Sequence, residues 1–544
     1  MSLAAFSNFL RQTLLAISVL TLAPPGWAGP TSMDAALLTP LTGSDTTAKL
    51  QAIARLGQSP GDRPAQVLVA LNTERLYSTP QGVILVLDDK QQATDAITGV
   101  ALTLPADASP IMVNNRLRGA ITAALAVSRL FSEDPQTRLA AAKLMQQSGD
   151  PSAAILIAQA QAKESNTEVR AALEIARASL DLKNTDPILR RQAVETLGNT
   201  ASAAFRPTLA GMLAMDANGV YAEPDATVRA AAATALTRID RHLSKIEWAG
   251  NLFYGISLGS ILLLAALGLA ITFGLMGVIN MAHGELLMIG AYVTYMAQWL
   301  FRQFAPAWID WYVIAAVPMA FLITACVGMA LERTVIRWLY GRPLETLLAT
   351  WGVSLILMQT VRTLFGAQNV EVSNPSWMSG GITLMGGLVL SYNRLVIIAF
   401  ALLVIFFVWL LLNHTRLGLF VRAITQNRRM ADCVGVPTGH VDMLAFGLGS
   451  GIAGLGGVAL SQLGNVGPDL GRSYIVDSFM VVVLGGVGQL AGTVIAAIGL
   501  GSINKFLEPW AGAVMAKITI LALIVLFVQK RPQGLFAPRG RSVE

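Results

Sequence analysis

Three polar side chains, Asn280, His283 and Glu285, lie where two long apolar runs of the sequence meet. Polar groups in such a place are costly to bury and are often functional. They could contact a polar solute by hydrogen bonds, but they could also gate its passage or brace the ends of two helices. The pattern favours gating or bracing, and all three residues are candidates for a solute path.

A glycine-rich stretch, residues 484–492, interrupts a later apolar run. Glycine tolerates the backbone dihedrals of a tight turn. A non-helical backbone at membrane depth is tolerated only where protein buries it or where it lines a cavity. Gly485, Gly486 and Gly488 are therefore further candidates for the solute path or its gate.

Several kinds of chemistry are excluded by the motifs. Residues 449–454 fit the pattern G-x-G-x-x-G, but they lie in an uncharged helical run with no strand before it, so we predict no dinucleotide site. The sequence contains no G-x-x-x-x-G-K-[ST] phosphate loop. Its two cysteines, Cys326 and Cys433, belong to no metal-ligand cluster. We expect no enzyme activity, metal or cofactor in this chain, so that any ATP is used by a partner.

The second half of the chain, residues 251–544, is predicted to be a polytopic α-helical membrane domain. Several of its uncharged runs reach the ~20 residues that a helix needs to cross a bilayer. Backbone groups in lipid must bond within their own segment, so the runs should be helices. They are residues 252–282, 286–300, 311–331, 346–361, 395–412, 443–468 and 478–504, with a last run that ends at Gln529.

Basic residues predict the orientation of these helices. The net charge of +6 comes almost wholly from the second half, which indicates membrane topology rather than binding to nucleic acid. Lys and Arg concentrate in cytoplasmic loops. The three basic segments contain Arg333, Arg337 and Arg342, then Arg416, Arg422, Arg428 and Arg429, then Lys530, Arg531, Arg539 and Arg541.

The front of the chain predicts export. A basic start, a short apolar core and a small-x-small end make residues 1–28 resemble a secretory signal peptide, although an uncleaved anchor is the alternative. Residues 29–250 would then be periplasmic and the C-terminus cytoplasmic, which requires an odd number of crossings. Eight runs conflict with this unless residues 477–505 form a helical hairpin, so we expect about 8–9 spans.

The exported region is predicted to be helical and repetitive, so the expected fold class of the whole chain is all-α. An Asp or Asn that suits a helix N-cap recurs four residues before Arg138, Arg170, Arg190 and Arg229. The spacing is irregular and resembles HEAT-type helical repeats, with a plain helical bundle as the alternative. One strand-like run, residues 82–87, precedes the helices.

An ordered series of motifs in residues 251–540 resembles the branched-chain amino-acid-type ABC permeases. The series comprises residues 268–292, residues 332–352, residues 416–436, the turn at 485–488 and the terminal residues 531–536. The resemblance implies a bacterial inner-membrane importer subunit that works with a second permease, two cytoplasmic ATPases and a periplasmic solute-binding protein. It also implies that residues 416–436 include the segment that docks on the ATPase. Its candidate residues are Arg416, Gly418, Arg422, Ala423, Asn427 and Gly435.

The long region before the first membrane helix departs from the amino-acid-transporting members of that family. It resembles instead the urea-transporter branch, in which one permease carries such an extension. The resemblance therefore implies urea as the solute, with a branched-chain amino acid or a short amide as the alternative. A membrane sensor or scaffold is a remote alternative, because only 15 residues follow Gln529.

Overall fold

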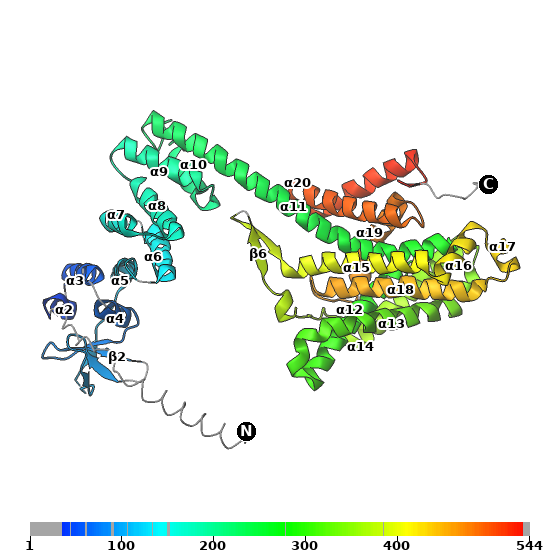
Figure 1. Ribbon diagram of the computed structural model, residues 1–544, viewed down its shortest axis with the longest axis horizontal. Helices are drawn as coiled ribbons and strands as arrows, with labels where there is room; N and C mark the ends of the chain where they lie inside the picture. The colour runs from blue at the N-terminus through cyan, green and yellow to red at the C-terminus, as the bar shows by residue number, and fades with distance from the viewer. Residues whose placement is uncertain are drawn as a thin grey trace, which may run out of the picture. The chain divides into compact units, whose positions relative to one another are not determined.

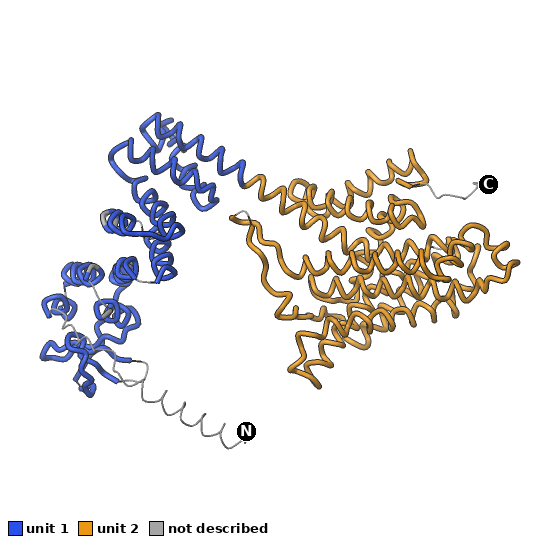
Figure 2. Tube along the Cα trace, in the orientation of Figure 1, with its two compact units in different colours: residues 1–242 blue, residues 243–544 orange. Residues whose placement is uncertain are grey.

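The computed structural model describes residues 35–536, apart from residues 44, 60–61, 89–91, 106, 133, 149–152, 278 and 385. The predicted signal peptide, residues 1–28, therefore lies outside the described residues, as do Arg539 and Arg541. The chain divides into two compact units, residues 1–242 and 243–544 (Figure 2). The division falls within one long helix, α11 (Ala226–Met276).

The first unit begins with four helices and a small sheet, so the fold is mostly but not entirely helical. The expectation of an all-α chain is wrong here, because five short antiparallel strands pair in the order β4-β3-β2-β1-β5. The predicted strand-like run corresponds to β2, and Gly82, with φ +84°, forms the turn before it. These elements are α2 (Ala35–Thr42), α3 (Thr46–Gln58), α4 (Asp62–Asn72), β1 (Leu76–Ser78), β2 (Ile84–Leu87), β3 (Ala93–Asp95), β4 (Ala101–Leu102), β5 (Ser109–Pro110) and α5 (Asn115–Arg129).

Helices follow to the end of this unit, and all four predicted cap residues, Asp134, Asn166, Asp186 and Asp225, accept hydrogen bonds from backbone N–H groups at helix starts. The Asn166 side chain accepts from the backbone N–H groups of Glu168 and Val169, and that of Asp186 accepts from Ile188. Such bonds satisfy donors that a helix start leaves free. The elements are α6 (Pro135–Ser148), α7 (Ala153–Lys163), α8 (Thr167–Asp181), α9 (Pro187–Asn199), η1 (Ala203–Phe205) and α10 (Arg206–Met212). The HEAT-type repeat stays a prediction.

Two bidentate ion pairs, which we call the Arg–Glu clamps, hold these helices. Arg138 donates to both carboxylate oxygens of Glu164 at 2.7 and 2.9 Å. Arg190 donates in the same way to Glu223 at 3.1 and 2.7 Å. Both glutamates are buried, and a carboxylate can be buried at low cost only when it is paired in this way. Sequence reasoning noticed both arginines but neither glutamate.

The second unit is a bundle of helices with one hairpin (Figure 1). Its β6–β7 hairpin is a further departure from the all-α expectation. After α11, the elements are α12 (His283–Phe304), η2 (Pro306–Trp311), α13 (Tyr312–Thr334), η3 (Ile336–Leu339), α14 (Pro343–Phe365), η4 (Ser376–Met378), β6 (Gly381–Leu384), β7 (Leu388–Ser391), α15 (Tyr392–His414), α16 (Arg416–Gln426), α17 (Arg428–Cys433), α18 (Thr438–Ser461), α19 (Leu470–Gly485) and α20 (Leu490–Lys530).

Six helices within the described residues are long and apolar enough to span a membrane. They are α11, α14, α15, α18, α20 and the segment Pro306–Thr334 that contains α13. The expected count of about 8–9 spans therefore stays a prediction. The apolar run at residues 477–505 is divided between α19 and α20 at the glycine-rich stretch, and α20 itself bends at Gly512, where φ is +77°.

Glycines allow the buried helix α18 to approach its neighbours closely. A Cβ atom on Gly451 would lie 2.6 Å from the ring of Phe321 in α13, and one on Gly449 would lie 2.6 Å from Thr272 in α11. Contacts this close leave no room for a larger residue, as in other packed membrane helices. The G-x-G-x-x-G pattern thus lies inside a helix–helix contact.

Candidate functional site

The polar residues between α11 and α12 are buried and reach different neighbours. The ring of His283 lies 2.9 Å, through Nε2, from the backbone oxygen of Ala265 in α11. Glu285 accepts a hydrogen bond of 2.9 Å from Ser354 in α14. The side chain of Asn280 accepts from the backbone N–H of Ala282 at 3.0 Å. The structure therefore places all three candidates at one helix start, but His283 and Glu285 contact different helices.

One face of α14 contacts the segment that holds residues 280–285. Thr350 accepts a hydrogen bond of 3.2 Å from the backbone N–H of Met281, and Ser354 donates to Glu285. Residues four apart lie on the same side of a helix, which is how one helix makes both contacts. Sequence reasoning included Thr350 in a family motif, but it did not single out either residue. Their signal is two hydroxyls at helical spacing in an otherwise apolar run.

Three side chains of the segment keep an unused polar atom. Asn280 Nδ2, His283 Nδ1 and Glu285 Oε2 are buried and have no hydrogen-bond partner among the residues that the structure describes. The residues are 1%, 0% and 3% exposed, respectively. Leaving a buried polar atom unpaired costs about 1–3 kcal/mol. Such atoms point to a function or to a ligand.

The predicted glycine turn is a contact between backbones. A Cβ atom on Gly485 would lie 2.6 Å from the carbonyl carbon of Gly492. Gly486 and Gly488 have φ values of +98° and +76°, which favour glycine. A Cβ atom on Gly486 would also contact the backbone oxygen of Phe536. The turn therefore contacts residues 535–536, and Leu535 N–H donates to Leu484 O at 2.8 Å.

The predicted ATPase-docking residues lie on α16, between α16 and α17, and in the loop after α17. Arg416 is the first residue of α16, whereas Arg422 and Ala423 lie near its middle. Gly418 packs so closely that a Cβ atom there would contact the backbone oxygen of Leu412. The other two residues shape the chain. The side chain of Asn427 caps α17 by accepting from the backbone N–H of Met430, and Gly435 turns with φ +87°.

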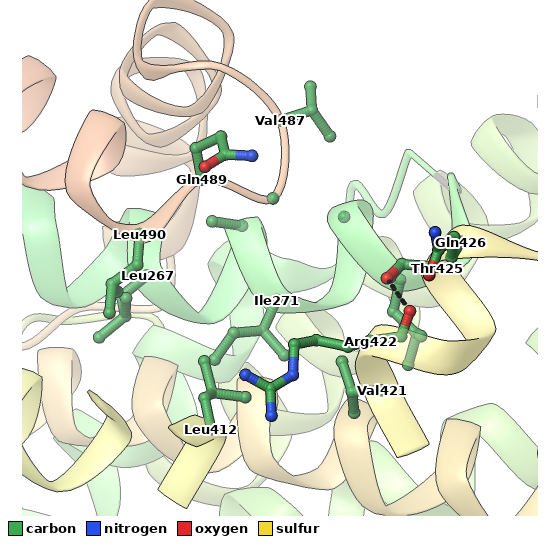
Figure 3. A pocket seen from close by; sticks show the side chains of 14 residues that line it. Leu267, Ile271, Leu412, Val421, Arg422, Thr425, Gln426, Val487, Gln489 and Leu490 are labelled. Carbon is green, nitrogen blue, oxygen red and sulfur yellow. Dashed lines mark hydrogen bonds between the residues drawn. The ribbon is translucent and has the colours of Figure 1, made fainter. Parts of the chain in front are cut away.

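A cavity of about 310 Å³ brings together two groups that the sequence suggested separately. Arg422 of α16 and Gly488 of the turn both line it. Figure 3 shows the Arg422 side chain reaching toward Leu412, across the cavity from Gln489. Apolar residues of α11 form its floor: Leu267, Ala270, Ile271 and Leu275. α16 and the turn therefore face one shared cavity.

A polar cluster joins two basic segments and was missed by sequence reasoning. Arg428 pairs with the buried Asp442, and its guanidinium lies 4.9 Å from the ring centre of Tyr340. Tyr340 donates a hydrogen bond of 3.0 Å to Glu332. Burial, reinforced by the nearby carboxylates, raises the pKa of Tyr340 well above its usual value, so the phenol stays protonated and can donate. The sequence feature that could have indicated this cluster is Asp442, a lone acidic residue at the start of an apolar helix.

Comparison with known proteins covers this second unit. Residues 251–528 match the model of a family described as the permease component of branched-chain amino acid transport systems. The chain belongs to this family. A relative from Pseudomonas aeruginosa, the high-affinity branched-chain amino acid transport system permease protein BraD, is 29% identical over 291 residues, which cover 52% of this chain and 94% of BraD.

Two further relatives of this chain are also permeases. The protein LivH of Escherichia coli (strain K12), named as a high-affinity branched-chain amino acid transport system permease, is 28% identical over 299 residues. These cover 52% of this chain and 94% of LivH. The ribose import permease protein RbsC of the same strain is 28% identical over 125 residues, 22% of this chain and 39% of RbsC. The chain is thus a transport permease component and not an enzyme.

Proposed function

We propose that this chain is the permease subunit of an ATP-driven importer that carries urea across the bacterial inner membrane. The family match over residues 251–528 supports the permease role and is the single observation that carries it. A second permease, two cytoplasmic ATPases and a periplasmic solute-binding protein would complete the importer. In this arrangement residues 1–28 are removed, the first unit is periplasmic and the C-terminus is cytoplasmic.

The extra first unit supports urea as the solute. The match spans about half of this chain but 94% of BraD or LivH, so these relatives lack a further unit of this size. A long extension is the feature that resembles the urea-transporter branch. Urea is small and uncharged, so its path requires hydrogen-bonding groups rather than fixed charge.

A branched-chain amino acid is the second candidate solute. It is favoured by the relatives BraD and LivH, which are both named as permeases for branched-chain amino acids. The same path could serve it, because a zwitterion also forms hydrogen bonds at both of its charged ends.

The proposed docking of α16 on an ATPase rests on its place beside the turn. Arg422 is exposed and lines the cavity that Gly488 also lines. Motion imposed on α16 by an ATPase would change the cavity that the α19–α20 turn also lines. The surface offered to the ATPase would also include Arg416 and Ala423. Its shape would depend on Gly418, Asn427 and Gly435.

Uptake of labelled solutes tests the proposal. Cells that lack this gene and cells that regain it are compared for uptake of labelled urea and of labelled leucine. We expect the gene to restore urea uptake at least tenfold above the deletion strain. Restoration of leucine uptake alone would contradict the urea assignment and support the second candidate, and restoration of neither would contradict both.

A further inference from the structure

Two helix N-termini meet inside the second unit. His283, the first residue of α12, lies beside Ala265, about three turns back from the end of α11 at 3.6 residues per turn. The start of α12 therefore lies beside the interior of α11 rather than beside its end. A Cβ atom on Gly284 would lie 2.6 Å from the backbone oxygen of Gly471, which belongs to the first turn of α19.

Neither helix start is capped by a side chain. The N-cap residues are Ala282 for α12 and Asp469 for α19, and neither makes a side-chain capping hydrogen bond. The first turn of a helix carries a partial positive charge. At these two starts, the N–H groups of His283, Glu285 and Leu470 already donate to backbone oxygens. Gly284 and Gly471 are buried, so these two starts meet away from solvent. Such a junction attracts an acceptor oxygen.

An unpartnered acceptor lies at the same junction. Glu285 belongs to the first turn of α12, and its Oε2 atom is buried without a partner. Its other oxygen accepts from Ser354, so the carboxylate is held in place while one oxygen remains available. Two turns further along α12, the hydroxyl of Tyr292 is also buried without a partner, and its ring lies 4.8 Å from that of Phe365 in α14.

We propose that the junction of α12 and α19 is a binding site for a small solute that carries a C=O group beside N–H groups. The oxygen of the solute lies at the two helix starts, and an N–H group of the solute donates to Glu285 Oε2. Urea, a short amide and an amino acid share this chemistry. This inference rests on the proposed transport function, but it holds for either candidate solute.

The two kinds of group at the junction explain this choice of solute. An anion would be favoured by the helix starts but opposed by the Glu285 carboxylate. A cation would be favoured by the carboxylate but opposed by the helix starts. A molecule with an acceptor and a donor a few ångströms apart satisfies both. Discontinuous helices whose N-termini face the solute are also a general feature of transporter sites.

Cysteine labelling in the assembled importer tests the site. The chain has two cysteines, Cys326 and Cys433, and serine replaces both in the background variant. Ser354→Cys then places a thiol beside Glu285. We expect a small membrane-impermeant methanethiosulfonate reagent, added from outside, to label this thiol, and the transported solute to slow the labelling at least threefold. Urea and leucine are tried separately.

A matched control is a serine buried elsewhere in the same unit. Ser450 of α18 is 0% exposed, and its hydroxyl donates to Phe446 O at 2.7 Å. Ser450→Cys should be labelled at least ten times more slowly than Ser354→Cys, with no effect of either solute. If Ser354→Cys does not reach the membrane, Thr350→Cys replaces it one turn earlier on the same face of α14.

Glu285→Gln tests the chemistry of the site. It removes the charge of the carboxylate and should raise the half-protecting solute concentration at least tenfold while labelling itself persists. Protection by urea supports both the site and the urea assignment, whereas protection by leucine alone supports the site and contradicts urea. The site is wrong if neither solute protects in cells that still take up one of them, or if Glu285→Gln leaves protection unchanged.

Discussion

At the scale of single residues, the second unit depends on buried charges that have one partner. Asp442 is 0% exposed at the start of α18, and Arg428 neutralises it from α17. The Arg428 side chain is itself 41% exposed and lies over Tyr340. The pair therefore fixes α17 against α18. The contact of Arg428 with the Tyr340 ring also holds the segment around Tyr340 against them.

Removal of Arg428 should destabilise the protein. Breaking a fully buried pair costs about 3–5 kcal/mol because a buried charge remains without a partner. The exposure of Arg428 reduces the expected loss in Arg428→Ala to about 1–3 kcal/mol. The measurement is thermal unfolding of the purified chain in detergent. The double variant Arg428→Ala/Asp442→Asn should recover most of the loss, and a double variant as unstable as the single one would contradict this explanation.

At the scale of elements, the contact between α19 and α20 depends on the absence of side chains. Gly485 and Gly492 pack backbone against backbone. Gly492→Ala should separate the two helices and lower both the amount of protein in the membrane and its melting temperature. Gly499→Ala is the matched control in the same helix, since a Cβ atom there would meet nothing within 4 Å. Alanine favours a helix by about 1 kcal/mol over glycine, so equal losses in both variants would refute the packing argument.

The Arg–Glu clamps make part of the stability of the first unit dependent on pH. The hydrogen bonds from Arg138 hold the pKa of Glu164 below its ordinary value of 4.5, although burial acts in the opposite direction. A lowered carboxylate pKa contributes stability above the ordinary value, and this contribution is lost as the pH falls through the lowered pKa.

Glu164→Gln should therefore lower the melting temperature of the full chain clearly at pH 7 and much less near pH 3. At the lower pH, below the ordinary glutamate pKa of 4.5, the unfolded wild-type chain gains a proton at Glu164, so the ion pair contributes less to stability. The measurement is the loss of helical circular dichroism on heating, in detergent, at both pH values. Arg191, whose partner Glu195 is exposed, offers a control in Glu195→Gln, which should have little effect at either pH. An equal loss for Glu164→Gln at both pH values would contradict the charge-based explanation.

The sequence predicts where the helices of this protein lie better than it predicts where they break or end. Long apolar runs predict the membrane helices because burial in lipid permits few other structures. The run predicted at residues 252–282, however, ends as helix at Met276, and Gly277 follows with φ +66°. Glycines are common in this region, so composition does not single out Gly277 as the one that turns.

Partners in space explain most of what the sequence did not predict at the candidate site. Glu285 was predicted because a carboxylate is rare in an apolar region. Ser354 was not singled out, since a serine becomes significant only when α14 is known to face it. The same holds for Glu164, which is one of many surface-like glutamates until Arg138 is seen beside it. The short strands β4 and β5 have two residues each, too few for a periodic pattern.

At the scale of the whole molecule, each unit has a hydrophobic core of its own. The clusters of buried residues in the first unit contain Leu56 and Leu173, for example, and those of the second contain Leu264 and Val481. Each of these clusters draws its members from one side of the division in α11. The second unit should therefore fold without the first.

Deletion of residues 35–225, with residues 1–34 kept, tests this independence. We expect the shortened chain to reach the membrane in an amount within about twofold of the full chain, because the burial that drives folding is internal to the second unit. Immunoblotting of membrane fractions measures the amount. Loss of the shortened chain from the membrane would show that the second unit depends on the first.

The glutamates of the two Arg–Glu clamps recur at the same spacing as two further arginines, although the clamp arginines Arg138 and Arg190 do not share it. The same number of residues separates Glu164 from Glu223 and Arg170 from Arg229, and both arginines donate to the backbone oxygen of the glutamate that precedes them. One local arrangement, a buried glutamate whose backbone oxygen accepts from an arginine six residues later, therefore occurs twice in the first unit. If both copies face the same partner, a partner with two matching contacts would be held by avidity rather than by a single strong contact.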